Sequence, residues 1–325
     1  MLSTRSLKPG AQAVFHKAGG LHLVRWMHRK GLRILMYHRF SEPAGLDSQC
    51  RHIRENYAPV SLDQVDAWLK SGDPLPMNAI AITVDDGYRD FHDVAYPVFA
   101  AWQIPVTVYL VTDFLDGRLW LWTDQVKWAF EHTPLRRFSK ELAPGNVLDL
   151  SLETPQQRRS AARQTSEILK RQPNAVRLSV LSELPGWLKI AMPASPPSGT
   201  EPLGWEDARK MAGAGVTFGA HTRTHPVLSR VSGGRELHDE VEGSKLRIEQ
   251  ALERPVHHFC YPNGQPGDIT PECVETVRQA GFRTAVTTTT GLIYHGEDRC
   301  LLPRIGVEPE YDALYFQRCA AAFRV

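Results

Sequence analysis

Several features that would assign a protein class at once are missing from this sequence. Its five cysteines include no CxxC pair, and their odd number does not suit a complete disulfide framework. No apolar stretch approaches the roughly 20 residues of a membrane-spanning helix. Spaced Cys/His fingers and aromatic RNA-binding motifs are absent, and a net charge of +2 gives no global reason to bind nucleic acid. We therefore expect a globular protein with free thiols in a reducing compartment and no nucleic-acid partner.

Acidic residues are also missing from the N-terminus, where the first one is Glu42. Within residues 1–32, Leu21, Val24 and Met27 recur at helical spacing among basic residues, which predicts a basic helical segment. The segment lacks the apolar core of a secretory signal, although its composition also suits a transit peptide. Two alternatives stay open: its apolar side packs on the rest of the protein, or it lies on an anionic membrane surface. We expect a cytoplasmic protein, either free or in peripheral membrane contact.

Short runs rich in Val, Ile, Thr and aromatic residues recur along the chain, with helical patterns between several of them. They predict strands at 33–38, 79–84, 106–111, 216–221, 257–262, 283–288 and 301–307. This alternation predicts a parallel α/β sheet that closes into a barrel, whose chemistry lies at the carboxyl ends of the strands. We expect one barrel domain over 33–325. An excursion at about 112–204 should carry a substrate-facing loop and surface helices.

Two motifs at predicted strand ends combine residues that suit chemistry. In "TVDDGYRDF", Asp85 and Asp86 follow a buried strand directly, although Asp-Gly is also an ordinary turn dipeptide. In "GAHTRTHP", His221 and His225 share a face if the segment makes one helical turn. Two imidazoles and one carboxylate form the ligand set of an open catalytic zinc site. Either motif alone is weak evidence, but together they predict a metal site.

Three motifs in this order resemble those of a known family. TVDDG, HTRTH and "FCYPNG" are similar to the first three motifs of the polysaccharide deacetylases, carbohydrate esterase family four. The opening "ILMYHRF" and the closing "LPRIGV" resemble the branch with exopolysaccharide and poly-N-acetylglucosamine deacetylases. The resemblance spans roughly residues 33 to 307. It implies a distorted (β/α)7 barrel that removes acetyl groups from glycans with the help of a metal.

The resemblance also implies roles for individual residues. Asp86, His221 and His225 would hold a divalent metal, expected to be zinc, that activates water and polarises the acetyl carbonyl. Asp85 would be the general base. The backbone amide of Asn263, where the family usually has Tyr, would stabilise the oxyanion.

The general acid and the partner of Asp85 are less direct assignments. His38, in the pair Tyr37–His38, is the candidate acid, with a structural histidine under the barrel rim as the alternative. Cys260 stands where many members place an Arg that pairs with the base. Arg304 is the candidate replacement, with an ordinary rim ion pair as the alternative. The candidate substrate contacts are Tyr88, Tyr261 and Trp122, although aromatic residues are more often part of a core.

The predicted function is metal-dependent removal of N-acetyl groups from an amino sugar of a bacterial glycan or its lipid-linked precursor. Two alternatives remain. The same fold and motifs would suit deformylation or hydrolysis of a small amide, because nothing in the motifs separates acetyl from formyl. The departures at Cys260 and Asn263 would instead suit a glycan-binding homologue without turnover.

Overall fold

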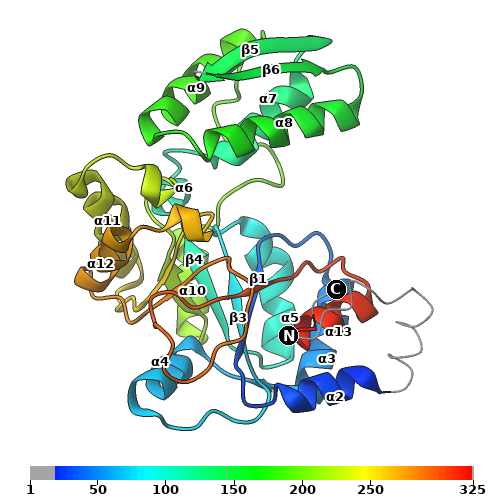
Figure 1. Cartoon of the computed structure of the whole chain (residues 1–325), viewed down its shortest axis with the longest axis vertical. Helices are drawn as coiled ribbons and strands as arrows, with labels where there is room; N and C mark the ends of the chain where they lie inside the picture. The colour runs from blue at the N-terminus through cyan, green and yellow to red at the C-terminus, as the bar shows by residue number, and fades with distance from the viewer. Residues whose placement is uncertain (1–18, 144, 324–325) are drawn as a thin grey trace.

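A curled sheet of parallel strands forms the centre of the protein (Figure 1). The computed structural model describes residues 19–143 and 145–323. The strand order is β10-β1-β3-β4-β7-β8-β9, and the short β2 pairs with β3. The bounds are β1 Arg33–Tyr37, β2 Ala58–Pro59, β3 Ala79–Val84, β4 Val106–Leu110, β7 Thr217–Ala220, β8 His258–Cys260, β9 Thr284–Val286 and β10 Ile305–Gly306.

The last segment of the sheet brings its two edges together. Val286 of β9 forms a parallel bridge with Leu302. Three residues later β10 begins, and its Ile305 pairs with Leu35 of β1. The sheet therefore curls from β9 back to β1, and the predicted distorted (β/α)7 barrel is confirmed. Each of the seven predicted strand regions contains a strand.

The strands form because short apolar runs are covered on both faces. All six residues of β3 and all five of β4 are buried. In β1, Leu35 and Tyr37 pack in the large cluster beneath the outer helices. Ile34 belongs instead to a second cluster with Tyr109 and Val286, which come from other strands of the barrel. The alternation along β1 thus serves two cores at once.

Helices surround the barrel and cover its outer face (Figure 1). The longest, α11, buries Leu237, Val241, Ile248 and Leu252, which recur at helical spacing. A capping box between Ser61 and Gln64 begins α4. The helices of this part are α3 Pro43–Asn56, α4 Leu62–Ser71, α5 Tyr96–Ala101, α6 Thr112–Leu115, α10 Trp205–Gly213, α11 Gly234–Leu252, α12 Pro271–Gln279 and α13 Ala313–Ala320, with a π-helical turn at Phe91–Ala95.

A compact unit rises above the barrel at the top of Figure 1, and we call residues 122–188 the insertion. It comprises α7 Trp122–His132, β5 Arg137–Ala143, β6 Asn146–Ser151, α8 Pro155–Leu169 and α9 Asn174–Trp187. The strands form an antiparallel hairpin that the sequence patterns do not predict. A hydrophobic cluster of its own fills the unit. The division of the chain into domains stays a prediction.

The described part of the basic N-terminal segment contains α2, Gly20–Met27. Leu21 and Val24 are buried and pack in a small cluster with Ala321 and Phe323. Met27, the third residue of the predicted stripe, is instead 51% exposed. Residues 1–18 of the predicted segment lie outside the described residues. Within the described chain, no helix has both the length and the apolar character needed to cross a membrane.

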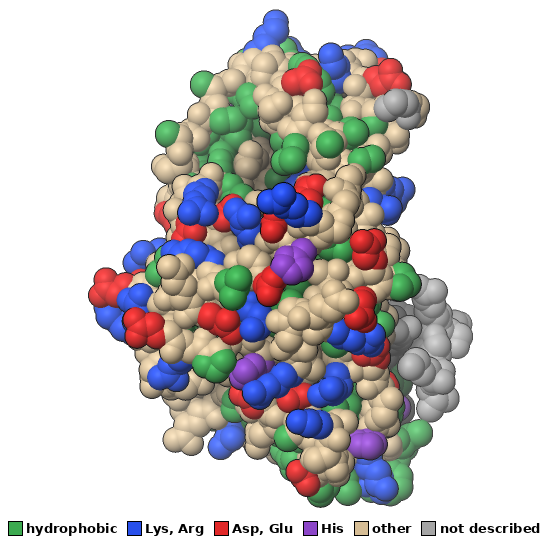
Figure 2. All heavy atoms as spheres, turned by 90° about the vertical axis from the view of Figure 1, so that its left-hand side faces the viewer, with side chains coloured by type: hydrophobic (Ala, Val, Ile, Leu, Met, Phe, Trp, Pro, Cys, Tyr) green, Lys and Arg blue, Asp and Glu red, His purple; other side chains and the backbone are tan. Residues whose placement is uncertain are grey.

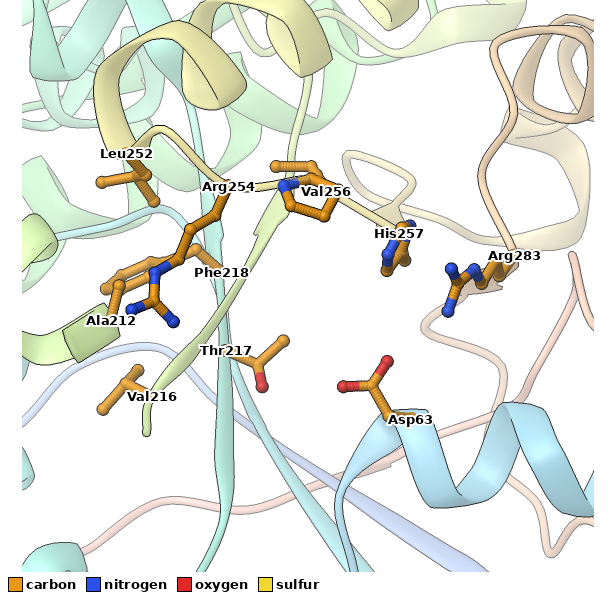
Figure 3. A pocket seen from close by; sticks show the side chains of 11 residues that line it. Asp63, Ala212, Val216, Thr217, Phe218, Leu252, Arg254, Val256, His257 and Arg283 are labelled. Carbon is orange, nitrogen blue, oxygen red and sulfur yellow. The ribbon is translucent and has the colours of Figure 1, made fainter. Parts of the chain in front are cut away.

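A cavity of about 330 Å³ opens at the amino-terminal end of the barrel (Figure 3). Thr217, the first residue of β7, contributes to its wall, and Asp63, His257 and Arg283 lie on one side of it. The predicted site residues Asp85 and His221 follow the carboxyl ends of β3 and β7, at the opposite end of the barrel. The cavity is therefore distinct from the candidate site.

Candidate metal centre and active site

The turn after β3 directs two adjacent carboxylates to different partners. Asp86 has a φ of 76° and Gly87 a φ of 81°. A Cβ on Gly87 would lie only 2.8 Å from Cδ2 of Leu110, so the turn needs glycine there for its conformation and for space. Asp85 contacts Arg304, whereas Asp86 contacts the two histidines.

The histidine motif follows β7 and forms a tight non-helical turn. The segment does not make the helical turn that its spacing would allow, because Thr222 and His225 have positive φ values of 67° and 58°. The backbone N–H of His225 donates to Oγ1 of Thr222 at 3.0 Å, which helps to hold this strained conformation. The turn still brings the two imidazoles together, with their Nε2 atoms 3.2 Å apart.

Three candidate ligand atoms converge on one point. Oδ1 of Asp86 lies 3.5 Å from Nε2 of His221 and 3.4 Å from Nε2 of His225. Tetrahedral zinc with bonds of about 2.0–2.1 Å separates its ligand atoms by roughly 3.3 Å, so these spacings fit one small cation. Nδ1 of His221 is 2.7 Å from the carbonyl of Cys260. A proton donated there leaves the Nε2 lone pair directed at the site.

A second group of potential ligands, Asp85, His221 and Cys260, also lies within reach of one ion. This group is the weaker candidate, because both oxygens of Asp85 already accept from Arg304. Burial, which is the largest influence, also raises the pKa of the Cys260 thiol and disfavours the thiolate that a metal needs. Asp86, His221 and His225 therefore form the better metal site.

Arg304 forms a buried, bidentate ion pair with Asp85. Its Nη1 and Nη2 each donate to one carboxylate oxygen at 2.7 Å. The two side chains are 0% and 2% exposed, so the alternative of a rim ion pair is wrong. Burial is the largest influence on Asp85 and opposes its ionisation. The charge and hydrogen bonds of Arg304 outweigh burial, with help from His38 and His221, and the pKa of Asp85 falls below its usual value.

Cys260 occupies the position next to this pair where the resemblance places an arginine. Its Sγ lies 3.5 Å from Oδ2 of Asp85 and 3.1 Å from Nη2 of Arg304. Nε of Arg304 donates to the carbonyl of Thr287, and Nη1 also donates to Oγ1 of Thr83. The guanidinium thus reaches Asp85 from the segment before β10, and the small thiol leaves room for it.

His38 and Asn263 follow the ends of strands that flank these groups. His38 follows β1, and its Nε2 is 3.7 Å from Oδ2 of Asp85. Its side chain is 37% exposed, so it can exchange protons with water, whereas Asp85 cannot do so freely. Asn263 follows β8 with a φ of 61°, and its side chain donates to Asp268. Among the described residues, no acceptor takes its backbone N–H.

The three predicted substrate contacts are buried and present no open ring face. Tyr88 is 5% exposed, and its hydroxyl donates to Oδ2 of Asp124 at 2.6 Å. Tyr261 is 1% exposed and packs edge-on against Phe259. Trp122 is 4% exposed, and its Nε1 donates to the carbonyl of His225 at 3.1 Å. The structure places Trp122 behind the metal site, as a support for the histidine turn.

Glu240 is a supporting residue that lies outside the sequence motifs. One of its carboxylate oxygens accepts from the backbone N–H groups of Arg223 and Thr224, both at 2.9 Å. The other accepts from the hydroxyl of Thr224 at 2.5 Å. Glu240, which belongs to α11, therefore fixes the turn between His221 and His225. An acid within the buried stripe that includes Leu237 and Val241 was the available signal.

Comparisons with known proteins relate parts of this chain to polysaccharide deacetylases. A family model described as polysaccharide deacetylase matches residues 148–285, which include His221, His225 and the third motif but neither aspartate. The poly-beta-1,6-N-acetyl-D-glucosamine N-deacetylase of Escherichia coli (strain K12) is 31% identical over 117 residues. The match covers 34% of this chain and 17% of that protein, so the chain spans a small part of its curated relative.

Two solved structures share the fold over most of their length. The deacetylase PplD of Streptococcus pyogenes, solved with acetate, has a TM-score of 0.57 at 17% identity. The match covers 86% of this chain and 93% of that chain. IcaB from Ammonifex degensii has a TM-score of 0.56 at 16% identity, covering 91% and 98% of the two chains. At these identities the likeness concerns the fold.

Proposed function

We propose, from a resemblance to the polysaccharide deacetylases that extends over motifs, family model and fold, that this protein is a metal-dependent hydrolase. It would remove N-acetyl groups from an amino sugar of a bacterial glycan or its precursor. The observation that carries the proposal is the convergence of Asp86, His221 and His225 beside the ion-paired Asp85. The curated relative acts on poly-N-acetylglucosamine by its name, which supports a glycan substrate of this class.

A divalent cation, expected to be zinc, would be held by Asp86, His221 and His225 and would supply Lewis acidity toward a water molecule and the acetyl oxygen. The donor set suits this ion, because two neutral imidazoles and one carboxylate leave positions open for water and substrate. The fixed tautomer of His221 supports the same assignment, because it keeps Nε2 available.

The protein's own residues would manage the protons. Asp85, kept ionised by Arg304, would accept a proton from the attacking water. His38 would donate a proton to the sugar nitrogen as the carbon–nitrogen bond breaks, which releases acetate and a free amine. Its contact with solvent lets it regain that proton. The backbone N–H of Asn263 would donate to the oxyanion of the tetrahedral intermediate.

The Asp85–Arg304 pair also bears on the alternative functions. A glycan-binding homologue without turnover was suggested by the missing arginine at Cys260. Because Arg304 supplies the same kind of partner from another segment, that departure no longer favours loss of activity. A deformylase on the same fold keeps the same residues and is separated only by experiment. Cytoplasmic location and a lipid-linked substrate remain proposals of lower priority.

The test is acetate release from N-acetylglucosamine oligomers by the purified chain loaded with zinc. Asp85→Asn should lower the rate by about 10²–10⁴-fold, the range of general acid–base contributions. His38→Gln tests the proposed general acid in the same assay. Its matched control is His238→Gln, because the His238 side chain is 52% exposed on α11. Release of formate from N-formyl sugars without acetate release would favour deformylation. Glycan binding without release of either acid would favour the binding homologue.

A further inference from the structure

We propose that the end of the protein formed by α2 and two neighbouring loops docks on an anionic lipid surface. The docking face consists of Leu23, Trp26, Met27, Met77 and Tyr294. This inference is independent of the proposed chemistry, because none of these residues belongs to the candidate site.

The docking face exposes large apolar side chains that a folded core would normally cover. Leu23, Trp26 and Met27 are 55%, 59% and 51% exposed, and they follow the helical spacing i, i+3, i+4. The opposite side of α2 is already used, because Leu21 and Val24 pack against the C-terminal segment. The helix is therefore apolar on two sides, and only one side faces the protein.

The two loops bring further apolar residues to the same end of the molecule. The backbone N–H of Asn78 donates to the carbonyl of Arg29 at 2.7 Å, which places Met77, 56% exposed, next to the end of α2. Leu32 forms an antiparallel bridge with Ile293. A Cβ on Gly31 would lie 3.3 Å from the ring of Tyr294, which is 45% exposed. Three segments thus meet around residues 29–32.

The charges around the docking face favour an anionic lipid surface over a second copy of the chain. Arg29 stacks its guanidinium 4.3 Å from the ring of Trp26, and Lys30 follows it. No acid precedes Glu42 in the chain, while Glu297, which accepts from the backbone of Tyr294, is an acid on the loop side. Exposed Trp and Tyr beside cations suit the headgroup region of an anionic bilayer. A second copy fits less well, because two cationic faces would repel each other.

Docking through this face would fix the orientation of the candidate site relative to the membrane. The α2 helix leads directly into the amino-terminal end of β1, whereas Asp85 and Asp86 follow the carboxyl end of β3, its parallel neighbour. Figure 1 shows α2 at the bottom of the molecule and the insertion at the top. A protein docked through α2 would hold the candidate site toward water. Its substrate would then approach from the aqueous side, which favours a glycan chain over a lipid-linked precursor in the same membrane.

Vesicle flotation with the full chain tests the proposal. Vesicles of phosphatidylglycerol and phosphatidylcholine are compared with vesicles of phosphatidylcholine alone. We expect binding to the anionic vesicles, with a loss of at least tenfold in apparent affinity for Trp26→Ser with Met77→Ser. The matched control is Leu178→Ser with Leu246→Ser, because these side chains are 51% and 56% exposed elsewhere. Arg29→Gln with Lys30→Gln should also weaken binding, by severalfold.

Three outcomes would overturn the proposal. If the Trp26/Met77 variant and the control variant bind anionic vesicles with equal affinity, the docking face does not carry the binding. If the unaltered chain binds neutral and anionic vesicles with equal affinity, lipid charge does not contribute to the binding. A dimer in sedimentation that the Trp26/Met77 variant abolishes, with no vesicle binding by the unaltered chain, would assign the face to a second copy. Met77→Ser alone lies outside α2, so it reports on the face even if α2 is disturbed.

Discussion

The barrel and the insertion bury very different side chains. The barrel encloses Asp85, Asp86, His221 and Arg304, all at most 9% exposed. The cluster inside the insertion is built from aliphatic and aromatic residues. Figure 2 shows hydrophobic side chains gathered on the insertion, and charges of both signs on the insertion as well as over the barrel. Buried charge is costly unless paired, and the barrel pairs its buried charges at the candidate site. The described part of the insertion buries one charged side chain, Arg177, and is otherwise stabilised by ordinary packing.

One of the contacts between the two regions supports the metal site from behind. Trp122 belongs to the core of the insertion and donates to the carbonyl of His225. The guanidinium of the buried Arg177, from α9, lies 5.3 Å from the Trp122 ring. Burial is the main cause that lowers the pKa of Arg177 to about 10. The insertion therefore contributes to the position of His225 without supplying a ligand.

The largest difference between the regions should appear when a buried arginine is removed. Arg304→Leu leaves the Asp85 carboxylate unpaired in the barrel, so we expect the free energy of unfolding to fall by about 3–5 kcal/mol, with loss of activity. Arg177→Leu removes hydrogen bonds to the neutral Asn174, at an expected cost of about 1–3 kcal/mol. Urea unfolding measures both. Equal costs would show that the two burials do not differ as described.

Matched core truncations should separate the two hydrophobic cores. Phe130 and Phe259 are each 0% exposed, one in the insertion and one in the barrel. Each change to Ala should cost about 3–5 kcal/mol. Phe259 lies between His258 and Cys260, so Phe259→Ala should also weaken metal binding. Phe130→Ala should leave it nearly unchanged, as titration calorimetry with zinc can measure. Equal loss of zinc affinity would mean that the cores are not separate.

Acid should weaken the barrel first, through His52. Burial, with the nearby Arg25 and His22, lowers the pKa of His52 from 6.5 to about 4. Between these values the unfolded state binds more protons, so stability falls as the pH falls from 6.5 to 4. Hydrogen exchange should accelerate in α3 and α13, where His52 meets Phe316, before it does in α8. His52→Gln should flatten this slope; an unchanged slope would refute the assignment.

The smallest expected effect concerns the contact between the regions. Trp122→Phe keeps an aromatic ring but removes the N–H that donates to His225. We expect a loss of about 1 kcal/mol in stability and up to tenfold in metal affinity, the lower end for a supporting contact. Trp187→Phe, also in the insertion but partly buried, is the control. If both variants bind zinc equally well, the Trp122 contact does not position the site.

Residue type and strand position made most of the barrel predictable from sequence. The runs that became β3 and β4 consist of aliphatic, aromatic and threonine residues typical of buried strands, and Asp85, Asp86 and His221 follow strand ends. Arg304 was found because the missing arginine at Cys260 required another partner for Asp85.

The remaining features depend on tertiary contacts. In the β5–β6 hairpin, β5 buries only Phe138, Leu142 and Ala143, without a regular alternation that predicts a strand. Trp122 was assigned to sugar binding because sequence does not show which aromatic faces are covered. The conformation of the histidine turn stayed open, because spacing alone does not reveal the positive φ values at Thr222 and His225.

The most direct test of this account is the metal content of the purified chain after zinc loading, with Asp86→Asn and His225→Ala beside it. His238→Ala serves as the exposed histidine control. The account predicts one tightly held zinc per chain, retained in His238→Ala and lost in the other two variants while their circular dichroism is preserved. Zinc that stays bound in Asp86→Asn and His225→Ala, or no zinc in the unaltered chain, would contradict it.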